Sequence, residues 1–199
     1  MPHFLRVLSA LFAALLLGAC GTTPKAQHYI LDDGTTAPGP NAHPSVLLLT
    51  ATLPELLDRP QLVLRGSQNQ ITFSEQQRWA EPLRVGIPRA MAADLGRALA
   101  SAQVAALPAG APLFDADFRL TLHVQRLEAQ PGNGVDLDML WVLQPREGKE
   151  IRGRSQIHEK LEEPSFPAAV AAQRRALGRA SSEIAAAIRQ QAPAAPQSR

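Results

Sequence analysis

The stretch FRLTLHVQ, residues 118–125, decides the fold. Every second residue in it is apolar, and the residues between them are polar or charged. Side chains of a β-strand point alternately to its two faces, so the pattern predicts a strand with one buried and one solvated face. The segment therefore indicates a sheet that covers a core on one side.

Two further strands are predicted directly after this one. They follow the turn sequences PGNG at residues 131–134 and PREGK at residues 145–149, whose length favours an antiparallel meander. The apolar face of the second strand comprises Val135, Leu137, Met139, Trp141 and Leu143, and the polar face of the third comprises Arg152, Arg154, Gln156, His158 and Lys160.

Shorter apolar runs before the meander predict more strands, and two longer periodic segments predict helices. The strand segments are residues 28–31, 46–50, 61–65, 70–73 and 103–107. Residues 61–65 and 70–73 are expected to form a hairpin. Apolar residues from Leu83 to Leu99 follow a helical period. Ser165 is the expected N-cap of a closing helix, and the Ser74-x-x-Gln77 spacing of a capping box predicts a helical segment that opens near Glu75.

These elements predict a single α/β domain with three layers, in which a mixed sheet with an antiparallel meander is flanked by two main helices. An α+β arrangement is the alternative. The hydrophobic fraction of 45% and the charged fraction of 19% are typical of a globular domain. A formal charge of +2 spread along the chain does not form the basic surface that nucleic-acid binding requires.

Cys20 is the single cysteine, so the chain forms no internal disulfide and no Cys-x-x-Cys metal or redox pair. It ends a segment with a short basic start, an apolar run from Val7 to Leu17 and two small residues, which is the layout of a secretory signal peptide. The apolar run is shorter than the ~20 residues that span a bilayer as a helix.

The sequence Leu17-Gly18-Ala19-Cys20 resembles the lipobox of bacterial lipoproteins. The resemblance implies cleavage before Cys20, a diacylglycerol on its thiol and an acyl chain on its new amino terminus. Two or three acyl chains hold a protein stably on a membrane. Gly21, in place of an aspartate, implies export to the outer membrane. The alternatives are an ordinary signal peptide that contains a cysteine and a buried N-terminal helix.

The search for catalytic and metal-binding motifs finds no nucleophile elbow, phosphate loop or dinucleotide fingerprint. His158-Glu159 begins like a zinc-protease motif, but Glu162 replaces the second histidine. Asp136 and Asp138 share a strand face and resemble an acid/base pair. A charge ladder with arginines and histidines of the neighbouring strands is the preferred interpretation. We therefore expect no enzyme activity, no metal and no cofactor apart from the covalent lipid.

The stretch SEQQRWAEPL, residues 74–83, stands out because a tryptophan lies beside an arginine before a predicted helix. Arg78, Trp79, Glu81 and Pro82 are therefore the candidate partner-contact residues, since tryptophan and arginine are favoured at interfaces. The other interpretation is structural: Trp79 packs under the helix start, with Arg78 and Glu81 paired nearby.

With these residues the chain resembles the PqiC-type ABC-transport auxiliary lipoproteins. The most specific stretches are Asp58-Arg59-Pro60-Gln61 and Arg78-Trp79-Ala80-Glu81-Pro82-Leu83. The lipobox, the Tyr29-Ile30-Leu31 strand, the meander with Trp141 and the Ala-rich closing helix agree with it.

This resemblance implies an adaptor that hydrolyses nothing. It implies a periplasm-facing lipoprotein on the outer membrane that works with an MCE-family protein, a permease and an ATPase in intermembrane lipid transport. A stand-alone lipid-binding or hydrolytic envelope lipoprotein is the alternative, and a homo-oligomer stays open. The expected divisions are a signal peptide at 1–19, a lipidated tether at 20–27, the auxiliary-lipoprotein domain at 28–191 and a disordered tail at 192–199.

Overall fold

The structure, a computed structural model, describes residues 25–32, 34, 41–67, 69–107 and 114–191. The predicted signal peptide, the lipidation site Cys20 and the predicted tail at 192–199 lie outside the described residues. The helices and strands, in chain order, are β1 (Gln27–Tyr29), β2 (Val46–Thr52), β3 (Gln61–Arg65), β4 (Ile71–Trp79), α2 (Leu83–Leu99), β5 (Val104–Ala106), β6 (Phe118–Gln130), β7 (Gly134–Pro145), β8 (Ile151–Glu159) and α3 (Phe166–Gln191).

The sheet has eight strands and is organised around β6, the longest of them. Along one edge β6 pairs antiparallel with β7, which pairs in turn with β8, so the predicted meander is confirmed. Along its other edge β6 pairs in parallel with β2 near Phe118 and with β3 at Ala129. The sheet therefore divides beyond β6 into two wings, one ending in β5 and the other continuing through β4 to β1.

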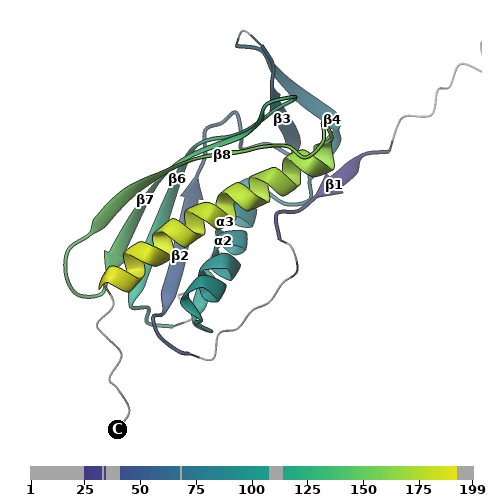
Figure 1. The fold of residues 1–199 in the computed structure, drawn as a ribbon. Coiled ribbons are helices and arrows are strands. Elements are labelled where there is room, and N and C mark those ends of the chain that lie inside the picture. Colours follow the sequence, from purple (N-terminus) through teal and green to yellow (C-terminus); the bar gives the residue numbers. More distant parts are fainter. Residues whose placement is uncertain (1–24, 33, 35–40, 68, 108–113, 192–199) are drawn as a thin grey trace, which may run out of the picture.

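Both helices lie on the same face of this sheet and contact each other (Figure 1). The predicted single α/β domain with a mixed sheet, a meander and two main helices is therefore confirmed, but the domain has two layers and the prediction of three was wrong. The physical reason lies in the opposite face of the meander. Its outward side chains are mostly charged or polar, and several pair with one another across the strands, so this face needs no covering helix.

The helix predicted to open near Glu75 is absent, because residues 71–79 form β4. This strand is antiparallel to β3 and parallel to β1, and it continues as far as Trp79. The Ser74-x-x-Gln77 spacing is a local signal, whereas the backbone pairing on both sides of β4 satisfies the amide groups of the whole segment. The predicted hairpin between β3 and β4 is confirmed, and it projects beyond the rest of the sheet in Figure 1.

The two helices begin where the sequence predicts. Pro82 is the N-cap residue of α2, and the helix continues past Pro88 to Leu99. In α3 the Ser165 hydroxyl accepts a hydrogen bond from the Ala168 amide at 3.2 Å, which confirms Ser165 as the N-cap. Among the described residues no helix is both long and apolar enough to cross a bilayer.

An ion pair inside the helix layer joins α2 to α3. Asp94 is 8% exposed, and its carboxylate accepts two hydrogen bonds from the guanidinium of Arg174, at 2.5 and 2.7 Å. Arg97, one turn later on α2, donates to the same carboxylate. A buried carboxylate is tolerated only when it is paired in this way, so Asp94 fixes how the two helices lie against each other.

We predict that Asp94→Ala lowers the free energy of unfolding by about 3 kcal/mol, because it leaves a cluster of guanidinium groups without its carboxylate in a largely buried position. Chemical denaturation of the purified domain measures this. The matched control is Asp58→Ala, whose partner Arg84 is 57% exposed. That change should cost less than about 1 kcal/mol. Equal losses for the two variants would contradict a special role for Asp94.

Two glycines offer a second, paired prediction. A Cβ at Gly153 of β8 would collide with the indole ring of Trp141, whereas a Cβ at Gly178 of α3 would meet only ordinary contacts at 3.7 Å. We expect Gly153→Ala to destabilise the domain by about 1–3 kcal/mol through overpacking. We expect Gly178→Ala to stabilise it by roughly 0.5–1 kcal/mol through helix propensity. Thermal unfolding of both variants would separate them, and a shift of the same sign would refute the packing argument.

Candidate functional site

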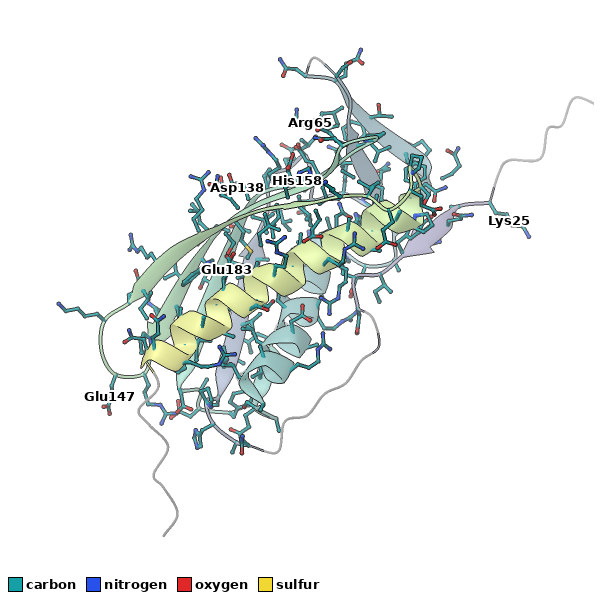
Figure 2. The ribbon with its side chains drawn as sticks, in the orientation of Figure 1. Lys25, Arg65, Asp138, Glu147, His158 and Glu183 are labelled. Carbon is teal, nitrogen blue, oxygen red and sulfur yellow. The ribbon has the colours of Figure 1, made fainter. Side chains whose placement is uncertain are left out.

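The uncovered face of the meander is the candidate functional site, and we call it the open face. It consists of outward side chains that lie opposite one another in the register of three strands. They are Arg119, Thr121, His123, Arg126 and Glu128 of β6, Asp136, Asp138, Leu140, Val142 and Gln144 of β7, and Arg152, Arg154, Gln156 and His158 of β8. In Figure 2 Arg65, Asp138 and His158 lie along the upper side of the sheet, whereas Glu183 lies below it on α3.

The two aspartates of β7 are held by cross-strand partners. Asp138 accepts two hydrogen bonds from Arg154, at 2.8 and 2.6 Å, and Asp136 lies 2.8 Å from Nδ1 of His158. The hydrogen bond from Arg154 lowers the pKa of Asp138 below its ordinary value. A general acid would need the opposite shift, so Asp138 does not fit that role. The geometry thus favours the charge ladder over the acid/base interpretation of these residues.

A partly buried ion pair closes the hairpin end of the open face. Glu128 is 5% exposed, and its carboxylate accepts hydrogen bonds from Nε and Nη2 of Arg65, the latter at 2.9 Å. The side-chain hydrogen bond to Glu128 raises the pKa of Arg65. The sequence prediction did not include this pair. A sequence feature that could have indicated the pair is Glu128 itself, two residues before the end of the partly buried strand β6. An acid at such a position is rarely left unpaired.

The open face also exposes an apolar side chain. Leu140 is 40% exposed and lies between His123 and Arg154 in the register. Arg119, which lies opposite Gln144 in the register, is exposed. An exposed apolar side chain beside a guanidinium is a composition that favours association with another protein.

The stretch that sequence analysis selected has a mainly structural place. Trp79 is 6% exposed and packs in the core, and its backbone amide donates to the Pro60 carbonyl at 2.7 Å. Arg78 pairs with Glu75 at 3.0 Å, and Glu81 pairs with Arg89 at 2.5 Å. The burial of Trp79 favours the packing role for that residue, although Arg78 and Glu81 do not pair with each other.

This same region joins the two stretches that carried the family resemblance. Gln61 lies opposite Arg78 in the register, and Asp58 accepts two hydrogen bonds from Arg84 just after Leu83, both at 2.8 Å. Residues 58–61 and 78–84 therefore form one joint, at which β3, β4 and the start of α2 meet. The two stretches that are most specific to the family resemblance are therefore in contact with each other in the fold.

A serine, an aspartate and a histidine meet at the start of β2. Oδ2 of Asp117 accepts hydrogen bonds from the amide and the hydroxyl of Ser45, and Nδ1 of His43 lies 2.7 Å from the same oxygen. Burial alone would raise the pKa of Asp117, but the bonds from Ser45 and His43 outweigh it and lower the pKa. A nucleophilic serine needs contact with the histidine base, whereas here both side chains bind the carboxylate. The cluster fastens β2 to the start of β6.

A polar cleft and a smaller apolar pocket lie in the described part of the molecule. The cleft, about 350 Å³, is lined by Arg119, Arg146 and Glu150 among others at the end of the meander. The apolar pocket, about 70 Å³, lies between Leu64, Ala129 and Phe166. Within the described ranges no three His, Cys, Asp or Glu side chains are grouped as metal ligands. His158 and Glu159 lie on strand β8, where ligands four residues apart do not share a helical face.

The shifted pKa of Asp138 gives a pH-dependent prediction. A carboxyl whose folded-state pKa is lowered stabilises the fold above its unfolded pKa and loses that contribution as the pH falls through the folded value. Arg154→Gln should therefore raise the pKa of Asp138 toward its ordinary value of 3.8. The variant should also lower the free energy of unfolding more at neutral pH than at acid pH. Carboxyl ¹³C titration by NMR measures it. The control is Asp117, whose pKa should not move; an unchanged Asp138 would contradict the assigned cause.

Comparison with known proteins identifies the family. Two solved structures share the fold: a crystal structure of an uncharacterised protein has a TM-score of 0.68 and 20% identity, and it covers 83% of this chain and 99% of its own. Protein XCC0632 from Xanthomonas campestris has a TM-score of 0.58 and 16% identity, and it covers 83% of this chain and 100% of its own. No match was found among curated proteins. Residues 29–185 match the family described as "ABC-type transport auxiliary lipoprotein component", so the chain belongs to this family.

Proposed function

We propose that this protein is a PqiC-type adaptor in an MCE-dependent system that transports lipids between membranes. In this proposal Cys20 carries the lipid, the anchor lies in the periplasm-facing leaflet of the outer membrane, and the folded domain docks the MCE-family protein of a permease and ATPase complex. The family match, which spans residues 29–185, is the observation that supports it most directly.

The architecture suits an adaptor. The first strand of the fold is β1, which pairs with β4. These two strands lie at the opposite end of the sheet from β8. An anchor before β1 leaves the meander and its open face directed to other partners. A surface of fixed charges around Leu140 can orient a partner, because charge pairs across an interface set its register and speed its association.

The cavities give less support to a stand-alone lipid carrier. Ligand pockets of about 300–1,000 Å³ with a mainly apolar lining enclose most of a small molecule. The apolar pocket near Phe166 has about 70 Å³, and the larger cleft is lined by charged residues such as Arg146. Neither of these two cavities matches an acyl chain, which favours the adaptor.

A single capture experiment tests this proposal. The full chain with a C-terminal affinity tag is expressed in its native envelope, crosslinked and purified, and copurifying proteins are identified by mass spectrometry. We expect an MCE-family protein in the eluate and a mature protein whose intact mass includes acyl chains on Cys20. An unlipidated mature Cys20, or an eluate without an MCE protein, would overturn the proposal.

The control is Cys20→Ser, which removes the thiol that carries the lipid in this proposal. This variant should leave the outer-membrane fraction or keep its leader. The purified domain, residues 25–191, should still bind the MCE protein in solution, because the proposed docking face does not include the anchor.

A further inference from the structure

The edges of the sheet differ in length. β1 and β5, which end the two wings, have three residues each, whereas β8 has nine. Within the described part of the chain β8 pairs with β7 alone, so one side of its backbone has no neighbouring strand. Short edge strands offer little to another chain, but a long one is a template for an added strand.

The free side of β8 can be assigned by residue. A Cβ at Gly134 of β7 would collide with the carbonyl oxygen of Glu159, so this carbonyl is directed at β7. In an antiparallel pair the backbone groups alternate between the two sides of the strand. The amide and carbonyl groups of Arg152, Arg154, Gln156 and His158 are therefore directed at the free edge, and those of the residues between them at β7.

This strand is held rigidly from its inner face. The Trp141 indole lies against Gly153 and donates a hydrogen bond to the Ser155 hydroxyl at 3.3 Å, and that hydroxyl donates to Glu183 of α3 at 2.6 Å. At the end of β8, Glu159 pairs with Arg179 at 3.0 Å and with Arg175 of the same helix at 3.4 Å. A template that is already ordered loses less entropy when a partner binds.

The outward side chains of β8 determine which strand fits. They are Arg152, Arg154, Gln156 and His158, a row that contains no acid, and the side chain of Arg152 is 80% exposed. Opposite residues of adjacent strands lie about 5 Å apart, so acids on an added strand would face these arginines. Behind β8, Asp138 compensates Arg154 and Asp136 lies beside His158. Among the described residues, Arg152 is compensated only by Glu150 in the preceding turn.

A second copy of this chain fits poorly. Antiparallel pairing of two β8 strands about Ser155 would place Arg152 opposite His158 of the copy and bring two Arg154 side chains diagonally together. Pairing about Gly153 would place Arg152 directly opposite Arg154. Like charges on adjacent strands repel, so in these two registers the arginines disfavour a second copy and favour an acidic strand.

We propose that β8 is a docking edge for an extended acidic segment of a partner protein, which adds to the sheet as a ninth strand with its acids facing Arg152 and Arg154. The inference rests on the proposed function for the identity of the partner, but the chemistry of the edge is independent of it. Backbone hydrogen bonds supply the affinity in this mode of recognition, and alternate side chains supply the specificity.

Two synthetic peptides test the edge directly. One has the sequence Thr-Glu-Val-Glu-Val-Glu-Thr, and its counterpart has lysine at the three glutamate positions. Each is added to the ¹⁵N-labelled domain, residues 25–191, and amide exchange is followed by NMR. The acidic peptide should slow exchange at Arg152, Arg154, Gln156 and His158 and leave the amides between them unchanged. The lysine peptide should bind at least about tenfold more weakly.

Arg152→Glu is the reversing variant, because Arg152 is exposed and contributes little to the fold. It should weaken the acidic peptide about tenfold and favour the lysine peptide. Arg84→Glu on α2 is the matched control and should bind as the unaltered domain does. Equal binding of the two peptides, or acidic-peptide binding that leaves the four β8 amides unprotected, would overturn the docking edge. A dimer in sedimentation experiments that Arg152→Glu strengthens would also overturn it, because the edge would then bind a second copy of this chain. The capture experiment is a separate measurement, so its failure would remove the adaptor role and not this edge.

Discussion

The pairing of β6 with three strands at once is the constraint on which the rest of the structure depends. One edge of β6 is occupied by β7 along its length, and the other is shared by β2 and β3, which follow each other along it. This arrangement fixes which residues of the meander are buried, because a shift by one residue would turn every side chain to the wrong face. The helix layer, the core and the open face all follow from that register.

The part of the fold that sequence could predict is the part with a strong local period. Phe118, Leu120 and Leu122 alternate with polar residues, and the next two strands repeat the pattern between short turns. The helices were equally clear, since an N-cap serine precedes α3 and an apolar face runs along α2. The charge ladder was predicted as well, because opposite strands of a meander bring residues such as Asp138 and Arg154 together.

What the sequence could not supply are the features that distant residues determine. β4 carries a capping-box spacing, but its pairing with β1 and β3 outweighs that local signal. The number of layers depends on whether both helices share one face, and the pairing of Asp94 with Arg174, 80 residues apart, holds them there. Likewise the burial of Trp79 depends on its contact with Pro60 and the core. The Arg65–Glu128 pair was missed for the same reason, because β3 and β6 are far apart in sequence.

The place of β1 in the sheet has a mechanical consequence. Any pull that the preceding chain transmits to Lys25 reaches the domain through three residue pairs, in which Gln27, His28 and Tyr29 lie parallel to Gln77, Arg78 and Trp79. Tension along the strand axis shears these pairs together, whereas tension across it would open them one after another. The first strand therefore couples the preceding chain to β4, whose last residue, Trp79, is packed in the core.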